Sequence, residues 1–364
     1  AIRAVLAVAA ARAALLRPGG PPEPPRRVDP VRIGVSLGLT GRYAAPASMQ
    51  EQGFRLWAKQ QNLAGGLLGR PVKLLVRDDS GSPENAQAIY REFIRQDRMD
   101  FLFAPYSSEL TRAVAGLVGR HGFPLIASGA ATDSLWDDRD ARLVGLLAPA
   151  SRYAQGFLEL LAQRGVTRLA LFVFPGLFPE EAGRGAAAWA TRLGLEVVYR
   201  HRVGGATPDL AAAVVAARAA GAEAVLLCGY ARDADMGRRA VSGAGWRPRA
   251  LYATVGPTLE DYGGDLGRLA EGVFSASHWE PGLPYPDADR FARDFLREYG
   301  RPASYHAAAA YAAGQLLARA VEQCRSTERS AVADALSSLD TVTVLGHFAV
   351  DPRGMQLRHF PVTI

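Results

Sequence analysis

Residues 101–132, which read FLFAPYSSELTRAVAGLVGRHGFPLIASGAAT, form the stretch that decides the fold. The apolar runs 101–104 and 123–127 are typical of buried strands, and apolar residues recur between them at helical spacing, at Val114, Leu117 and Val118. A buried strand, a helix and a second buried strand in this order predict two parallel neighbours in an α/β sheet. Open α/β sheets bind ligands outside the carboxyl ends of their strands, so the sequence predicts a site at the loops that follow the two runs.

Both loops carry hydroxyl groups near expected helix starts. Ser107 and Ser108 precede the predicted helix, and the second loop reads SGAAT over residues 128–132. Hydroxyl groups and free backbone N–H groups at the start of a helix form an uncharged cradle for a small anion such as a carboxylate. The competing interpretation is that these serines only cap helices. Both interpretations remain open at this point.

Strand and helix patterns alternate along most of the chain. Further apolar runs predict strands at 31–37, 72–76, 143–147, 169–174, 196–199, 224–227, 250–253 and 272–276. Helical stretches between most of these runs indicate parallel sheets with helices on both faces. The strands are too many for one sheet of ordinary size. The pattern therefore predicts an α/β fold made of two doubly wound parallel-sheet lobes.

Length and composition narrow the class of protein. The 364 residues are enough for two domains, and 49% hydrophobic with 21% charged residues is typical of a soluble globular protein. All of the 42 basic residues except Lys59 and Lys73 are arginine, and residues 1–30 supply half of the net charge of +6. The remaining arginines are spread out and are not clustered with aromatic residues. We therefore expect no nucleic-acid partner.

The sequence lacks the common motifs of catalysis and metal binding. It contains no GxGxxG, GxxxxGK[ST], GxSxG or HExxH motif, and its six histidines have no metal-ligand spacing. We expect no enzyme activity, no cofactor and no metal site, and the alternative is a Ser/His/Asp group assembled only in three dimensions. Cys228 and Cys324 lack zinc-ligand spacing. We expect free buried thiols, with a disulfide as the alternative.

Residues 1–30 differ in composition from the rest of the chain. Arg3, the apolar run 4–10 and small residues at A-x-A spacing are typical of a secretory signal, and residues 19–30 are typical of a proline-rich linker. Arg12 interrupts the apolar run. We expect a signal peptide and a periplasmic location, and a cytosolic origin is the alternative.

Five segments together resemble a known family. In order along the chain, with compatible spacing from about residue 31 to the C-terminus, they are LGLTGRYAAP, NLAGGLLGRPVKLLVRDDSGSPENA, APYSSELT, ASGAATDSLW and AYAAGQLLARAVE. The chain resembles type I periplasmic solute-binding proteins, in particular the leucine/isoleucine/valine-binding branch that feeds ABC importers. The resemblance implies two lobes joined by three hinge strands, with lobe 1 at 31–149 plus 280–345 and lobe 2 at 150–279 plus 346–364.

The same resemblance implies a ligand site in the cleft between the lobes. The carboxylate-binding serine of the family falls on Ser108, with Ser107 beside it. The loop that binds the carboxylate and the amine of the ligand falls on Gly129, Ala130, Ala131 and Thr132. An aromatic residue of lobe 2 that covers the ligand falls on Phe178, and the acidic partner of the ligand ammonium falls on Asp233, with Tyr230 in the same loop. Asp235 is the competing candidate for that acidic role.

The sequence departs from the family pattern at three places. The loop threonine of the family aligns with Ala131, one position before Thr132. An aromatic residue of lobe 1 aligns with Pro46, so Tyr43 is a possible substitute. The cysteine pair of some members is replaced by Gly81 and Ser107. Related proteins also bind aromatic carboxylates, and a flat ligand ring could then contact two aromatic residues near the hinges, Tyr153 and Trp279.

These observations lead to one expected function and two alternatives. We expect a monomeric solute-binding protein that closes around a small carboxylate-bearing ligand and delivers it to the permease subunits of an ABC importer. An amino acid of the branched-chain type is the expected ligand, and an aromatic carboxylate is the alternative. A cytosolic ligand sensor with the same fold is the second alternative.

Overall fold

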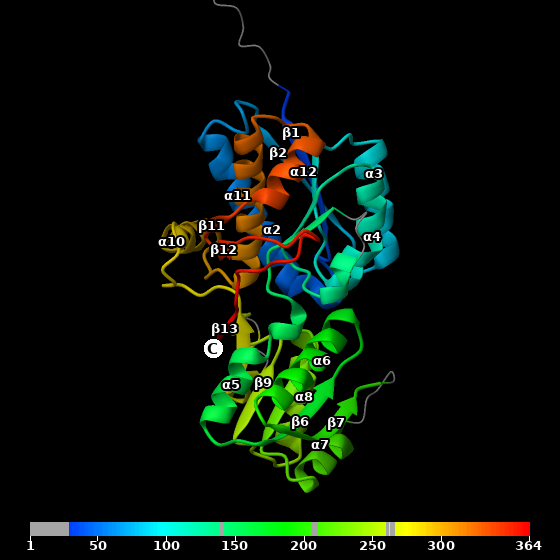
Figure 1. Ribbon diagram of the computed structural model, residues 1–364, viewed down its shortest axis with the longest axis vertical. Coiled ribbons are helices and arrows are strands. Elements are labelled where there is room, and N and C mark those ends of the chain that lie inside the picture. Colours follow the sequence, from blue (N-terminus) through cyan, green and yellow to red (C-terminus); the bar gives the residue numbers. More distant parts are fainter. Residues whose placement is uncertain (1–28, 138–141, 205–209, 260–261, 263–265) are drawn as a thin grey trace, which may run out of the picture.

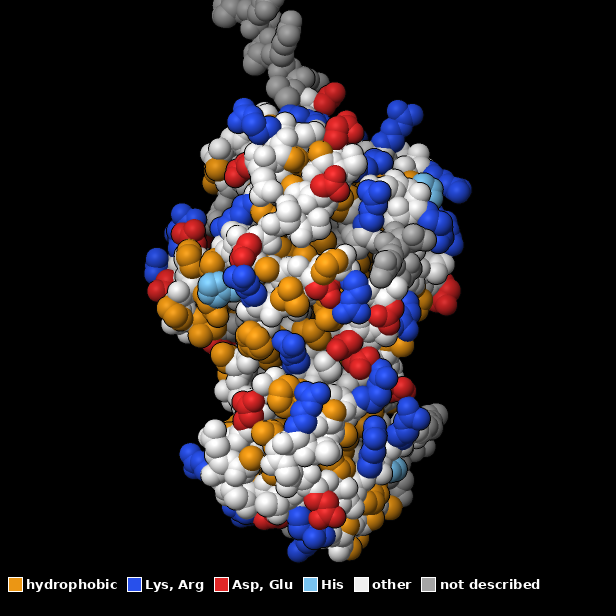
Figure 2. Space-filling model, viewed as in Figure 1, with side chains coloured by type: hydrophobic (Ala, Val, Ile, Leu, Met, Phe, Trp, Pro, Cys, Tyr) orange, Lys and Arg blue, Asp and Glu red, His pale blue; other side chains and the backbone are white. Residues whose placement is uncertain are grey.

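The computed structural model describes residues 29–137, 142–204, 210–259, 262 and 266–364. Two sheets lie at opposite ends of the long axis, each with helices around it (Figure 1). The space-filling view shows a narrower waist between the two parts, with positive and negative side chains interspersed over this face (Figure 2). The expected signal peptide and most of the expected proline-rich linker, together residues 1–30, fall on residues 1–28, which lie outside the described residues.

The first sheet has five parallel strands in the order β2-β1-β3-β4-β5. Their bounds are β1 Val31–Leu37, β2 Val72–Asp78, β3 Phe101–Phe103, β4 Leu125–Ala127 and β5 Leu143–Gly145. The strands β1, β3 and β4 are almost fully buried, because helices cover both faces of the sheet. In this order the connections turn to opposite sides at β1 and β3, which is where doubly wound sheets bind ligands.

The second sheet has the same winding. Its order is β13-β10-β9-β8-β6-β7, in which every pair is parallel except β10 with β13. The bounds are β6 Arg168–Val173, β7 Glu196–Arg202, β8 Ala224–Cys228, β9 Ala250–Ala253, β10 Val273–Ser277 and β13 Val362–Thr363. The predicted α/β class with two doubly wound parallel-sheet lobes is confirmed.

Helices connect most of the strands along the chain and cover the faces of the two sheets (Figure 1). In the part that contains the first sheet they are α2 Ala44–Leu63, α3 Pro83–Arg95, α4 Ser108–Arg120, α10 Ala288–Tyr299, α11 Tyr305–Cys324 and α12 Arg329–Ser338. Around the second sheet they are α5 Gln155–Gln163, α6 Leu177–Arg192, α7 Leu210–Ala219 and α8 Ala231–Gly243. Short 3₁₀ helices occur at Gly41–Tyr43, Asp133–Asp137, Ala150–Arg152 and Gly267–Ala270. Among the described residues, no helix is both long and apolar enough to cross a membrane.

Helices α2 and α11 pack closely although they are far apart in the sequence. A Cβ atom on Gly53 of α2 would overlap the carbonyl oxygen of Ala307 in α11. A Cβ atom on Gly314 of α11 would overlap the ring of Trp57 in α2. Glycine at both positions lets the two backbones approach, so residues after the second sheet complete the core around the first one.

The chain passes between the two parts three times. The first two passages follow β5 and β10, near the boundaries at 149/150 and 279/280 that the resemblance implies. For the third, residues 346–364 were expected in lobe 2, but β12 Gly346–Phe348 pairs with β11 Thr341–Thr343, and Gly145 N donates to Gly354 O. Only β13 joins the second sheet. We therefore propose that the third passage lies at about 357–361.

The two cysteines lie far from each other in the fold. Both thiols are free, with Cys228 buried at the end of β8 and Cys324 half-buried at the end of α11. Burial raises the pKa of the Cys228 thiol to about 12, so this group stays protonated at neutral pH. Free thiols agree with the expectation from the sequence, except that Cys324 is only half-buried.

Candidate functional site

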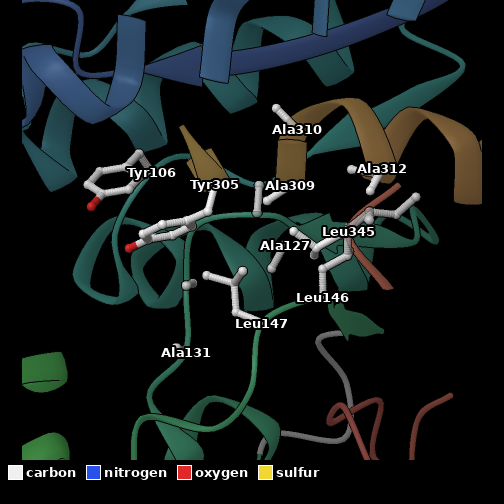
Figure 3. Packing of buried hydrophobic residues seen from close by; sticks show 14 of the residues in the cluster. Tyr106, Ala127, Ala131, Leu146, Leu147, Tyr305, Ala309, Ala310, Ala312 and Leu345 are labelled. Atoms are coloured by element: carbon white, nitrogen blue, oxygen red, sulfur yellow. The ribbon is translucent and has the colours of Figure 1, made fainter. Parts of the chain in front are cut away.

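A small cavity lies between the carboxyl ends of the two sheets. Its volume is about 10 Å³, roughly the space of one water molecule. Loops that follow β3, β4 and β5 line it from the first part, and loops that follow β6, β8 and β9 line it from the second. The lining residues are Tyr106, Ser108, Gly129, Ala131, Leu147, Tyr153, Phe178, Tyr230, Val255, Tyr305 and His306. Figure 3 shows Tyr106, Tyr305 and Leu147 on the side of the first lobe.

Two adjacent serines, Ser107 and Ser108, stand at the start of α4 and make different hydrogen bonds. Ser107 is the N-cap, and its Oγ accepts a hydrogen bond from Leu110 N at 3.3 Å. Ser107 also has φ 93° and ψ 152°, a backbone conformation that only glycine adopts easily. Because Ser107 caps the helix, the hydroxyl of Ser108 is available for other contacts.

Ser108 connects the helix start to the loop 129–132. Its buried Oγ accepts hydrogen bonds from the backbone N–H groups of Ala131 at 3.3 Å and Thr132 at 3.2 Å. Two amides therefore converge on one hydroxyl, next to the cavity that Ser108 and Ala131 line. Thr132 Oγ1 is buried and has no hydrogen-bond partner among the described residues. Because Ser108 Oγ accepts both bonds, its own O–H group is the neutral donor left for a small anion, and the predicted anion contact stays a prediction.

Gly129 is a position where the site has no room for a side chain. A Cβ atom there would lie 2.6 Å from Gln50 Nε2 and 2.7 Å from Tyr106 Cδ2. The Gln50 amide in turn donates to Ser128 Oγ at 3.1 Å. The loop is thus held against α2 and Tyr106, which fixes the position of its amides.

Aromatic rings form most of the remaining lining. The ring of Phe178 lies 5.0 Å from that of Tyr153 and 5.5 Å from that of Tyr230, measured between centroids. Burial raises the pKa of Tyr106, Tyr153 and Tyr230 well above the usual value, so all three are neutral at ordinary pH. The wall of the cavity is therefore apolar and uncharged, with hydroxyl groups at its edges.

Five lining residues are absent from the sequence prediction. They are Tyr106, Leu147, Val255, Tyr305 and His306. His306 is buried, with Nε2 3.3 Å from the Tyr106 hydroxyl, and burial lowers the pKa of its imidazole to about 3. The imidazole is therefore neutral at physiological pH. Leu147 and Val255 follow β5 and β9, so the rule that placed Ser108 and Gly129 could also have found them.

Asp233 does not line the cavity. Its carboxylate lies in the first turn of α8 and accepts a hydrogen bond from the backbone N of Tyr230 at 2.8 Å. Asp233 is half-buried, and burial raises the pKa of its carboxyl group. The competing candidate, Asp235, pairs with Arg239 at 2.9 Å on the next turn. The predicted contact of Asp233 with a ligand ammonium therefore stays a prediction.

The other expected residues do not line the cavity. The Tyr43 ring lies 5.5 Å from Tyr106 and 5.1 Å from Tyr230, so Tyr43 supports two residues of the wall. Trp279 is fully buried, with its ring 5.4 Å from that of Phe291, and packs in the core just after β10. Ser107 is the N-cap of α4, and Ala130 and Thr132 lie in the loop 129–132. Each is next in the sequence to a residue that lines the cavity.

Comparisons with known proteins agree on the family. A family model described as periplasmic binding protein matches residues 30–359. The chain is 23% identical over 326 residues to Leu/Ile/Val-binding protein homolog 7 of Brucella melitensis, which covers 85% of this chain and 81% of that protein.

Two solved structures show the same fold with different bound ligands. The branched-chain amino acid transporter substrate-binding protein LivJ of Streptococcus pneumoniae, in complex with isoleucine, has a TM-score of 0.80 at 19% identity. A solute-binding protein of an ABC transporter from R. palustris, in complex with benzoate, has a TM-score of 0.76 at 17% identity. Each comparison covers 92% of this chain and 95% of the other.

Proposed function

The chain belongs to the periplasmic binding protein family, and from that premise we propose that it captures a small carboxylate-bearing solute in the cleft for an ABC importer. The observation that supports this function is the convergence of the Ala131 and Thr132 amides on the Ser108 hydroxyl beside the cavity. A hydroxyl that accepts from two amides keeps its own O–H to donate, so Ser108 can bind a carboxylate without a full positive charge. A ligand held by neutral groups can also be released to a partner.

The mechanism that we propose is closure of two lobes around the ligand. Residues of both parts line the cavity, so a ligand there contacts both sheets at once. Contacts that exist only in the closed form supply the differential affinity that shifts the population toward closure. The three passages of the chain between the sheets are suitable hinge segments. No bond of the solute changes in this process.

We propose an aromatic carboxylate as the ligand class. Tyr106, Tyr153, Phe178, Tyr230 and Tyr305 supply ring faces and edges on several sides of the cavity. No lining residue is an Asp or Glu, and Asp233 is engaged with Tyr230 N. A ligand ammonium would therefore lack the expected partner, whereas a benzoate-like ligand does not need one.

A branched-chain amino acid is the second candidate. The Brucella relatives carry the name Leu/Ile/Val-binding protein homolog, and Leu147 and Val255 offer aliphatic contact in the same cavity. This candidate requires that Asp233 leave its backbone partner or that another acceptor bind the ammonium.

We further propose that the protein works in the periplasm as a monomer and delivers its ligand to permease subunits. The family description supports the location. The alternative of a cytosolic sensor predicts a different cell fraction, so fractionation of cells that express the full-length protein separates the two.

A binding screen tests the proposed function. Purified protein is titrated by calorimetry with benzoate, 4-hydroxybenzoate, leucine and isoleucine, and the same solutes are added in thermal unfolding. We expect binding of an aromatic acid, and a ligand at 100 times its Kd should raise the free energy of unfolding by about 2.7 kcal/mol. Benzyl alcohol is the matched control without a carboxylate and should not bind. Binding of leucine or isoleucine alone would contradict the aromatic class, and binding of none of the carboxylates would contradict the function.

A further inference from the structure

Glu109 is the residue next to Ser108 in the first turn of α4, and its carboxylate extends to the opposite lobe. Oε1 accepts a hydrogen bond from the backbone N of Leu177 at 2.7 Å. Oε2 accepts a hydrogen bond from the Tyr230 hydroxyl at 2.8 Å. One side chain of the first lobe thus bonds to two groups of the second, in addition to any contact with a solute.

The contact with Leu177 replaces a missing helix cap. Leu177 is the first residue of α6, and the N-cap Gly176 has no side chain to bind the free N–H groups of that helix. A carboxylate at a helix N-terminus is favourable, because it accepts from a free N–H group and lies at the positive end of the helix dipole. Glu109 therefore caps α6 from the other lobe.

The lack of a side chain at Gly176 leaves room for the Glu109 carboxylate. A Cβ atom at position 176 would lie 2.5 Å from Glu109 Oε1, so the carboxylate would have to move away from this place. Gly176 also has φ 133°, where a larger residue would be strained. The absence of a side chain gives the carboxylate access to the helix end.

A second interlobe contact lies beside the first. The guanidinium carbon of Arg42, which follows β1 in the first sheet, lies 4.8 Å from the centroid of the Tyr43 ring and 5.1 Å from that of Tyr230. The Tyr230 hydroxyl that bonds to Glu109 therefore belongs to a ring that Arg42 also contacts. The attraction between the cation and this ring adds to the interlobe contact.

We propose that Glu109 is a positioning residue that holds the two lobes together by direct contact and so sets the affinity for every solute. The effect on solute affinity rests on the proposed function, but the effect on closure does not. We call Glu109, with its bonds to Leu177 and Tyr230, the latch. Its removal should raise the population of the open form. A solute can leave only from the open form. A larger open population should therefore make dissociation faster.

A double-mutant cycle tests the latch. The variants are Glu109→Ala, Gly176→Ala and the double variant. The control is Glu180→Ala, which removes a carboxylate from the first turn of α6, the helix that Glu109 caps. Glu180 pairs with Arg202, inside the second lobe. Solution scattering without added solute should show a larger radius of gyration for both single latch variants. Gly176→Ala should cause no further opening in the Glu109→Ala background, because the Cβ then has no carboxylate to meet.

Binding measurements provide the second readout. Glu109→Ala should weaken every solute that the wild type binds by about tenfold, mainly through faster dissociation, and Glu180→Ala should leave affinity unchanged. A loss confined to solutes with an ammonium group would overturn the latch, because Glu109 would then be a ligand contact. Identical scattering curves for wild type and Glu109→Ala would also overturn it. If no solute binds to the wild type, the proposed function fails while the scattering cycle still decides on the latch.

Discussion

Helices α4 and α8 begin at the cleft from opposite lobes, and their first turns use polar side chains in different ways. In α4 the N-cap Ser107 bonds to Leu110 N, which leaves the Ser108 hydroxyl facing the loop and the cavity. In α8 the N-cap is Tyr230, whose hydroxyl is directed to Glu109, and Asp233 bonds back to Tyr230 N. A polar residue in a first turn is free to contact a ligand only where a neighbour satisfies the helix end.

The largest expected effect is that of Ser108→Ala. The change removes the hydroxyl at which the Ala131 and Thr132 amides converge, and we expect affinity for a carboxylate to fall by about 1.5–3 kcal/mol. Calorimetric titration with the solute identified by the screen measures this loss. Full affinity combined with a large drop in melting temperature would show that Ser108 only supports the loop, and would remove the contrast between the two helices.

A smaller effect is expected at Ser107, where the two possible small substitutions separate capping from strain. Ser107→Ala loses the bond to Leu110 N and should lower the free energy of unfolding by about 1 kcal/mol. Ser107→Gly loses the same cap but relieves the conformation at φ 93°, so it should be more stable than the alanine variant. Chemical denaturation measures both. A marked loss of solute affinity in either variant would mean that Ser107 contacts the ligand directly.

The smallest effect is expected for Asp233→Asn. The amide oxygen can still accept from Tyr230 N, so the free energy of unfolding at neutral pH should change by only about 0.5 kcal/mol. Affinity for an aromatic acid should be unchanged. A selective loss of leucine or isoleucine binding would instead assign Asp233 to a ligand ammonium and make the two helix starts alike.

The pH dependence of stability gives an independent readout for Asp233. Burial raises the pKa of this carboxyl group above its usual 3.8, so ionisation costs more in the folded state than in the unfolded chain. The contribution of Asp233 to stability is therefore complete below 3.8 and is lost as the pH rises through the raised pKa. Other carboxyl groups also titrate in this range, so the readout is the free energy of unfolding of wild type relative to Asp233→Asn, which should decrease between pH 3 and pH 7.

Much of the fold could be predicted from the sequence, because buried parallel strands are short apolar runs and the helices between them are periodic. The third passage between the lobes, which the resemblance implies at about residue 346, is one that we propose to lie later. Residues 346–348 form a hairpin with β11 beside α11, and nothing in their composition distinguishes that pairing from a strand of the second sheet. Such pairings depend on contacts between distant segments rather than on local pattern.

The candidate site was predictable where a loop follows a strand. Ser108 and Gly129 follow strands of the first sheet and line the cavity, whereas Phe178 and Tyr230, which also line it, were expected only from the resemblance. Tyr305 and His306 were missed because they open α11, an alanine-rich helix whose pattern indicates only core packing. An unusual signal was present, since two large aromatic residues with polar groups begin a helix that continues with four alanines.

The role of Asp233 could not be settled by residue type and position, because a carboxylate in the first turn of a helix serves equally well as a cap and as a ligand partner. Only the position of its acceptor atom distinguishes the two. The same is true of Glu109, whose carboxylate lies in the first turn of α4 but caps a different helix.

The packing of α11 on α2 has a consequence for the order of events during biosynthesis. The Tyr311 hydroxyl bonds to Gln60 Oε1, and these residues lie 251 positions apart in the sequence. At roughly 5–20 residues per second, the ribosome adds the partner of α2 only after a delay on the order of 10–50 seconds. The apolar face of α2 stays without its final partner during that time, so the nascent chain depends on protection from aggregation.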